Sequence, residues 1–206
     1  MTDYFNLLGV PRLPWLETDS LKSRFHSLSS AAHPDRVHGS SEAEKLAANQ
    51  RYAELNAAYT CLREPKDRLL HLIELELGSK PKDVQRIPPG TMDLFVEVGQ
   101  ICREVDSFLG EKAKATSPLL QVQFFKQGMD WIDRLNALQQ RVNAQRDELT
   151  GELKAMNAPF AAPQPTSSPE RRASLPLERL EQIYRVFSYV SRWTEQIGER
   201  LVLLST

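Results

Sequence analysis

The sequence predicts an all-α protein made of two helical parts. Apolar residues recur every three or four positions along most of the 206 residues, which is the period of an amphipathic helix. Runs in which Val, Ile and Thr alternate with polar residues, as in β-strands, are missing. Three prolines and little apolar content over residues 79–91 predict a linker between the two parts.

The first part, residues 1–78, is predicted to contain a helical hairpin. A short helix over "YFNLLG" should end at Gly9, and Thr18 or Asp19 can cap the next helix. That second helix should end before Pro34, because the residue that precedes a proline is pushed out of the α region. Its apolar stripe consists of Leu21, Phe25, Leu28 and Ala32.

A third helix is expected to begin near Ser41, where Glu44 stands three residues later and completes a capping box. Two amphipathic helices joined by a short loop should pack antiparallel. A fourth helix should follow and end at Gly78. The apolar stripe of the third helix consists of Ala48, Tyr52, Leu55, Tyr59 and Leu62.

The second part, residues 92–206, is predicted to be an antiparallel bundle of three long helices. One apolar stripe runs over residues 94–109, and another begins after a Ser117 cap and passes through Phe124, Gly128, Trp131 and Leu135. The third runs over residues 180–204. Between the last two, residues 157–176 are rich in Pro, Ala and Ser, which predicts a flexible loop.

The composition excludes several classes of protein. A formal net charge of -1 provides no overall basic field, so no nucleic-acid or membrane partner is expected. Cys61 and Cys102 lie on apolar faces without a CxxC pair, which argues against a disulfide scaffold or a structural zinc site. With neither an apolar leader nor a stretch long enough to span a bilayer, we expect a soluble, cytoplasmic protein.

The tripeptide His33-Pro34-Asp35 stands on the exposed connection of the hairpin, where binding residues tend to be presented. A metal site with His26 and His38 is one interpretation, but the spacing matches no standard ligand set. An Asp-His general base is another, but no nucleophile or substrate-binding loop lies nearby. By itself the tripeptide favours a turn in which Pro34 breaks the helix and Asp35 bonds to the backbone.

The surrounding segments change this interpretation. In order, "DYFNLLGV", "HPDR" and "YAELNAAYTCLREPKDR" resemble the J-domain of DnaJ-type co-chaperones, whose helical hairpin carries HPD at its tip. The closer likeness is to the HscB/Jac type, in which a linker and a three-helix domain follow the J-domain. The segment "MDLFVEVGQICREVD" is similar to the F-L-M-E-x-x-x-L-R-E-E segment of that family.

The resemblance implies that His33, Pro34 and Asp35 dock on a DnaK- or HscA-type chaperone and stimulate its ATP hydrolysis. Pro34 stiffens the loop and so lowers the entropy cost of docking, and Asp35 can accept a charge-assisted hydrogen bond. Basic side chains that would steer the encounter are Lys22, Arg24 and Arg36. A solvated helix face is the alternative for the first two. The residues "SLSSAA" before HPD are small and neutral, where the family places basic residues and tyrosine.

The second part would bind an IscU-like scaffold protein for iron-sulfur cluster assembly. The positions that match the client-binding positions of the family are Val96, Glu97, Gln100, Ile101, Glu104 and Tyr189. Glu97 and Gln100 stand where the family tends to have Met and Leu, which leaves a J-domain co-chaperone for a different client as the alternative function. A helical interaction scaffold without a chaperone partner is the second alternative. None of these is an enzyme, and we expect no cofactor or metal, because neither a Gly-rich phosphate loop nor a cysteine ligand set is present.

Overall fold

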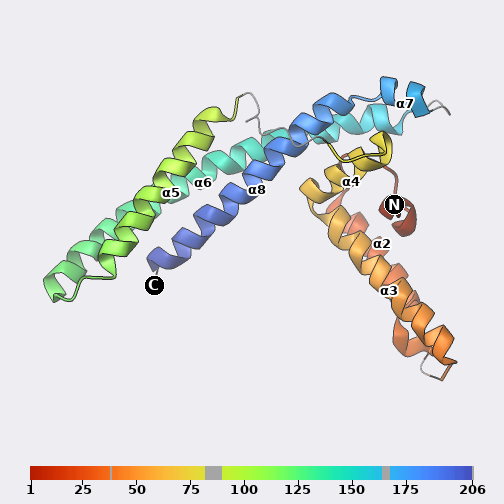
Figure 1. The fold of residues 1–206 in the computed structure, drawn as a ribbon, viewed down its shortest axis with the longest axis horizontal. Helices are drawn as coiled ribbons and strands as arrows, with labels where there is room; N and C mark the ends of the chain where they lie inside the picture. The colour runs from red at the N-terminus through yellow and green to blue at the C-terminus, as the bar shows by residue number, and fades with distance from the viewer. Residues whose placement is uncertain (38, 82–89, 164–167, 206) are drawn as a thin grey trace. The chain divides into compact units, whose positions relative to one another are not determined.

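The computed structural model describes residues 1–37, 39–81, 90–163 and 168–205, and these residues are helical apart from short connections (Figure 1). No strand occurs among them, so the predicted all-α fold class is confirmed. None of the helices in these ranges is apolar enough over a sufficient length to cross a membrane. In chain order the elements are α1 (Tyr4–Leu8), α2 (Thr18–Ala31), the 3₁₀ helix η1 (Pro34–Val37), α3 (Glu42–Arg63), α4 (Pro65–Leu77), α5 (Met92–Lys112), α6 (Pro118–Ala161), α7 (Ser168–Ser174) and α8 (Leu177–Ser205).

Packing divides the chain into two compact units, each described here by itself. The first comprises Met1–Asp83 and Thr150–Tyr184, and the second comprises Val84–Leu149 and Arg185–Thr206. This division differs from the predicted domains, because α6 and α8 contribute to both units. The 44 residues of α6 extend about 66 Å, whereas α5 has only 21 residues and can cover about half of that length.

The local signals that begin and end the helices of the first unit act as predicted at most positions. Asp3 accepts the backbone N–H groups of Phe5 and Asn6 at the start of α1, and Gly9 ends that helix in the left-handed conformation with φ 62°. The capping box of Ser41 and Glu44 is present at the start of α3. At α2 the structure differs, because Glu17 occupies the N-cap position and its side chain makes no capping bond.

The hairpin of α2 and α3 packs on α1 and α4 through a continuous core. Leu21 of α2 and Leu55 of α3 are buried, and the ring of Phe25 stacks on that of Tyr59 with centroids 4.3 Å apart. The most deeply buried apolar side chains of this core are Phe5, Leu8, Leu55, Ala58, Leu62, Leu69, Leu72 and Ile73. Of the stripe predicted for α3, Leu55 and Leu62 are buried in this core and the other three residues are partly buried.

Residues 150–184 join this core, which the sequence did not predict. Asn157 near the end of α6 exchanges two hydrogen bonds of 2.9 Å with the backbone of Trp15. In α7, Arg171 forms a bidentate pair with the buried carboxylate of Glu76, and Arg172 donates to the carbonyl of the same residue. These contacts fix segments that their composition alone would leave without a packed face.

The predicted flexible loop at 157–176 is therefore wrong for much of its length. α6 continues to Ala161 and α7 covers Ser168–Ser174. Alanine favours helix, and ion pairs to α4 hold α7, so tertiary contacts override the Pro/Ser composition. Residues 164–167, and residues 82–89 of the predicted linker, lie outside the described residues.

The second unit is built from α5, the first part of α6 and the last part of α8 (Figure 1). Its core contains the predicted stripes, and Arg200 of α8 donates to the carbonyl of Cys102 and to the carboxylate of Asp106 on α5. Buried side chains of this core include Val98, Cys102, Val105, Leu135, Leu138, Val142, Phe187, Val190 and Ile197.

His71 links α4 to α1 through a bond that depends on its protonation state. The side chain is buried, its Nε2 accepts the backbone N–H of Tyr4 at 3.1 Å, and its ring stacks on that of Tyr4 at 4.6 Å. Burial lowers the pKa of His71, because a charged imidazolium is poorly solvated there. Protonation of Nε2 would also remove the acceptor.

We expect the free energy of unfolding to decrease as the pH falls below about 6.5, the ordinary pKa of histidine. The unfolded chain binds the proton at a higher pH than the folded chain does, so acidification favours unfolding. Urea unfolding between about pH 7.5 and about pH 5.5 measures this slope. His71→Gln should flatten it, whereas His26→Gln on the exposed face of α2 should keep the wild-type slope. An unchanged slope in His71→Gln would contradict the assignment.

Candidate functional site

The tripeptide His33-Pro34-Asp35 forms the tip of the α2–α3 hairpin. α2 ends at Ala31, and Pro34 begins the 3₁₀ helix η1, as predicted from the steric effect of a proline on the preceding residue. The carbonyl of His33 accepts the backbone N–H of Arg36 at 3.0 Å. The tip is thus a short, hydrogen-bonded turn and not an open loop.

The imidazole of His33 is held from two sides while one nitrogen stays available. Its Nδ1 accepts the backbone N–H of Asp35 at 3.3 Å, and the ring meets the edge of Tyr52 on α3 with centroids 5.3 Å apart. Because Nδ1 accepts, we assign the hydrogen of the neutral ring to Nε2. No described residue bonds to Nε2, so it can donate to a partner.

Asp35 presents an exposed negative charge at the tip. Its side chain is 89% exposed, and one carboxylate oxygen lies 3.4 Å from Nδ1 of His33. While Nδ1 accepts the Asp35 N–H it carries no hydrogen for that carboxylate, which therefore keeps its acceptor capacity. An exposed carboxylate beside an imidazole donor is suited to bind a cationic group of a protein partner.

The three predicted steering residues differ in their surroundings. Lys22 and Arg36 are exposed, and no described residue pairs with either of them. Arg24 instead folds back on α1, where its Nε donates to the carbonyl of Leu8 at 2.9 Å. A Cβ atom at Gly9 would approach the guanidinium of Arg24 to 2.7 Å, so the two positions are packed together. Arg24 thus supports the end of α1, a contact that helical periodicity does not reveal.

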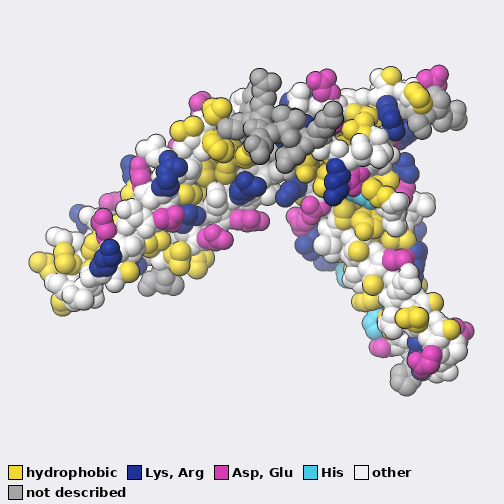
Figure 2. All heavy atoms as spheres, in the orientation of Figure 1, with side chains coloured by type: hydrophobic (Ala, Val, Ile, Leu, Met, Phe, Trp, Pro, Cys, Tyr) yellow, Lys and Arg dark blue, Asp and Glu magenta, His cyan; other side chains and the backbone are white. Residues whose placement is uncertain are grey.

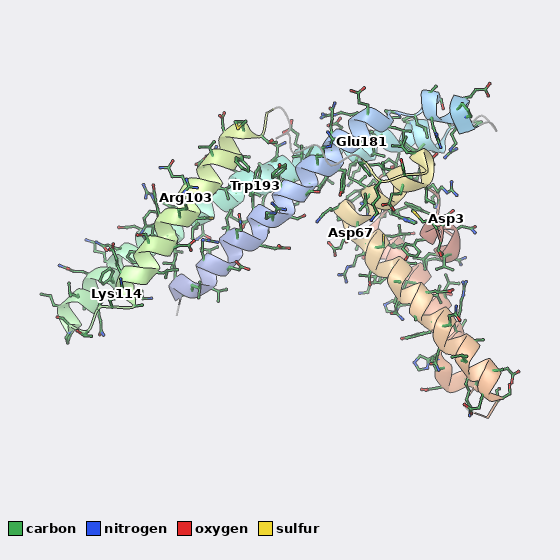
Figure 3. The ribbon with its side chains drawn as sticks, viewed as in Figure 1. Asp3, Asp67, Arg103, Lys114, Glu181 and Trp193 are labelled. Atoms are coloured by element: carbon green, nitrogen blue, oxygen red, sulfur yellow. The ribbon has the colours of Figure 1, made fainter. Side chains whose placement is uncertain are left out.

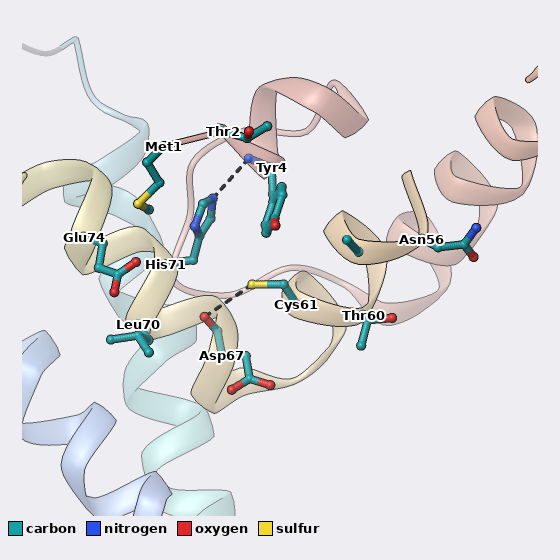
Figure 4. Close-up of a pocket in the computed structure, with 11 residues that line it drawn as sticks. Met1, Thr2, Tyr4, Asn56, Thr60, Cys61, Asp67, Leu70, His71 and Glu74 are labelled. Carbon is teal, nitrogen blue, oxygen red and sulfur yellow. Dashed lines mark hydrogen bonds between the residues drawn. The ribbon is translucent and has the colours of Figure 1, made fainter. Parts of the chain in front are cut away.

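Neither a metal site nor a catalytic site gains support in this unit. Among the described residues no group of His, Cys, Asp and Glu side chains could hold a metal ion, and His38 lies outside those residues. A pocket of about 600 Å³ does lie at the other end of the hairpin and contains Cys61, His71 and Asp67 (Figure 4). Burial raises the pKa of Cys61 to about 11, so its sulfur is a thiol at neutral pH and not an activated nucleophile.

Five of the predicted client-binding residues share one face of α5, because positions 96, 97, 100, 101 and 104 fall within about 140° around the helix axis, and Tyr189 lies on α8. Val96 is 55% exposed, and Gln100 is exposed and donates to Glu104 at 2.9 Å. Glu97 forms an ion pair with Arg141 of α6, and Ile101 is partly buried beside the core. The members of this face therefore differ in exposure and pairing, and Val96 and Gln100 are its most accessible positions.

Next to the predicted client-binding residues of α5, Tyr189 of α8 belongs to a group of apolar and aromatic side chains. Its ring meets the edge of Phe95 with centroids 5.9 Å apart and also lies against Trp193 at 5.8 Å. Phe95 and Met92 are 39% and 52% exposed, and neither is among the client-binding positions predicted from the sequence. Met92 stands three positions before Phe95 and four before Val96, a spacing that could have identified it as the neighbour of both on the helix surface.

Comparisons with known proteins show which family matches the first part of the chain and which solved structures the fold resembles. Residues 3–71 match the DnaJ domain family. The chain is similar to the crystal structure of human co-chaperone protein HscB, with 21% sequence identity, a TM-score of 0.57, and coverage of 98% of this chain and 82% of that chain. It is also similar to chaperone HscB from Vibrio cholerae, with 23% identity, a TM-score of 0.47, and coverage of 95% and 99%. The resemblance stated from the sequence is confirmed: residues 3–71 form a DnaJ domain, and the chain has the fold of human HscB.

The different roles of the basic residues can be measured. Arg24→Gln should lower the free energy of unfolding by about 1 kcal/mol, because the Leu8 carbonyl loses its donor. Lys22→Gln should change it by less than about 0.5 kcal/mol, since the side chain is exposed. Urea unfolding of both variants tests the assignment, and equal stabilities would contradict a structural role for Arg24.

Proposed function

We propose that this chain, whose residues 3–71 form a DnaJ domain, is a co-chaperone that stimulates the ATPase of a DnaK- or HscA-type chaperone. It would deliver to that chaperone an IscU-like scaffold protein for iron-sulfur cluster maturation. The observation that carries the proposal is the hairpin tip, where an ordered His33 and an exposed Asp35 point away from a well-packed core.

The tip can act on a partner without chemistry of its own. Nε2 of His33 donates and the Asp35 carboxylate accepts, so the two groups can bind a complementary pair of polar groups on the chaperone. The 3₁₀ turn and the Tyr52 contact hold His33 before docking, which reduces the entropy lost on binding. Lys22 and Arg36 would increase the encounter rate with an acidic surface. The co-chaperone would catalyse no reaction itself. Its cytoplasmic location stays a prediction.

The client would bind at the beginning of α5. Met92, Phe95 and Val96 expose apolar surface there, and Tyr189 adds an aromatic ring from α8. Such a cluster of aliphatic and aromatic groups is typical of a protein interface. Glu97 stands where the family tends to have Met, and it forms an ion pair with Arg141 that Met could not form. This difference at a client-binding position favours the alternative of a different client protein.

The first test is single-turnover ATP hydrolysis by DnaK-type chaperones of the source organism. The wild-type protein should stimulate hydrolysis, and His33→Gln should lose this effect by roughly 10- to 100-fold, the equivalent of one strong interfacial hydrogen bond. His26→Gln is the matched control, because His26 is exposed on the same helix hairpin but away from the turn. Thermal unfolding should be the same for all three proteins.

The same assay is repeated with an IscU-like scaffold. Stimulation that requires His33 and increases with the scaffold supports both halves of the proposal. Stimulation without a scaffold effect would favour another client. An absence of stimulation with every chaperone tested would mean that the tripeptide is a turn only.

The client face is tested by a charge placed among its apolar side chains. Val96→Asp should weaken binding of an IscU-like scaffold by at least about tenfold, because the new carboxylate would be desolvated in the interface. Val202→Asp is the matched control, since Val202 is 65% exposed in the same unit. Isothermal titration calorimetry measures both affinities, and equal loss in the two variants would contradict the assignment.

A further inference from the structure

The end of the second unit at the α5–α6 turn carries exposed apolar side chains that the proposed function does not use. Phe124 and Trp131 of α6 turn toward α5, where both rings lie near Phe108 at centroid distances of 5.6 Å and 6.4 Å. The other apolar residues of this segment face solvent. This group, the α6 tip cluster, consists of Leu119 (70% exposed), Leu120 (43%), Val122 (68%), Phe125 (71%) and Met129 (47%).

The described part of α8, the third helix of the unit, does not cover the cluster. Figure 1 shows that α5 and α6 extend past the described end of α8 toward the turn that joins them. The first fully buried large side chain of α6 is Leu135, more than four turns after the helix begins. Near the end of α8, Val202 is also 65% exposed.

The charge of this end differs from that of the whole chain. Residues 112–129 contain three lysines and no acidic residue, with Glu111 and Asp130 directly outside this segment, whereas the chain has a formal net charge of -1. Figure 3 places Lys114 at the turn, and Figure 2 shows hydrophobic side chains gathered at this end of the unit, with both basic and acidic groups beside them. No described residue forms an ion pair with Lys112, Lys114 or Lys126. Their charges are available to an anionic partner.

We propose that the α6 tip cluster inserts into the headgroup region of a membrane that contains anionic lipids. Exposed Leu, Val and Phe side chains together with lysines are the combination found on interfacial helices. At 100° per residue, Leu119, Leu120 and Val122 point in three directions around the helix axis. A partner helix would cover one stripe only, whereas lipid can surround a projecting end on all sides. The near-zero net charge predicted no membrane partner, but attraction to anionic headgroups acts locally, within about one Debye length.

Vesicle co-sedimentation of the full chain tests the proposal. The wild-type protein should bind vesicles of phosphatidylcholine with phosphatidylglycerol and bind vesicles of phosphatidylcholine alone more weakly. Lys112→Gln, Lys114→Gln and Lys126→Gln should each weaken binding to anionic vesicles by roughly fivefold, since one basic residue near the surface contributes about that factor. High salt should have a similar effect.

The apolar contribution has a closely matched control. Val122→Ser with Phe125→Ser should abolish most of the binding, whereas Leu46→Ser should not change it. Phe125 and Leu46 are 71% and 69% exposed, so neither change should affect folding, which circular dichroism can check.

Three outcomes would overturn the proposal. The first is no binding of the wild-type protein to anionic vesicles at low salt, and the second is binding that survives both sets of substitutions. The third is a dimer in analytical ultracentrifugation that Val122→Ser with Phe125→Ser disrupts, because the cluster would then be covered by a second copy of the chain. The test does not involve the chaperone or the scaffold, so its result is independent of the proposed function.

Discussion

The buried guanidinium of Arg68 is the interaction on which the geometry of the DnaJ domain depends. Only 2% of the side chain is exposed, its Nε donates to the carbonyl of Pro14 at 2.9 Å, and its Nη1 donates to that of Leu62 at 2.7 Å. One side chain thus ties the α1–α2 connection to the end of α3. Burial lowers the pKa of Arg68 to about 10, so the group is still charged at neutral pH. The two hydrogen bonds and the Trp15 ring, whose centroid lies 5.4 Å from Cζ, offset part of the lost hydration, whereas the buried Nη2 has no hydrogen-bond partner among the described residues.

Because Arg68 fixes the end of the hairpin that packs on α1 and α4, stability and recognition can lie at opposite ends of the hairpin. We call the end that packs on α1 and α4 the base of the hairpin. The base holds Arg68, His71 and the packing of α1, whereas the tip holds exposed polar groups that contribute little to folding. His33 is ordered by Tyr52, which is partly buried and lies one turn before the buried Leu55 on the same face of α3. A protein can therefore vary the chemistry of the tip with little effect on its fold. The departures from the family pattern just before His33 fall in this tolerant region.

The second unit separates two surfaces along one helix. The proposed client face lies at the beginning of α5, and the α6 tip cluster lies beyond its end. The 21 residues of α5 extend about 30 Å, so a partner at one end does not cover the other. A scaffold protein could then bind at Phe95 and Val96 while the α6 tip cluster contacts an anionic membrane surface. The length of α5 creates this separation.

The sequence by itself determined the features that depend on local chemistry: the all-α class, the end of α1 at Gly9, the capping box of Ser41 and Glu44, and the exposed HPD turn. These follow from backbone sterics and short-range hydrogen bonds, which neighbouring residues control. The tertiary structure alone decided that Arg24 supports α1, that α7 is helical through Arg171 and Glu76, and that Phe125 is exposed although it follows the buried stripe so closely. The reason is physical, because burial depends on which distant helix lies opposite a side chain, and periodicity contains no information about where that helix ends.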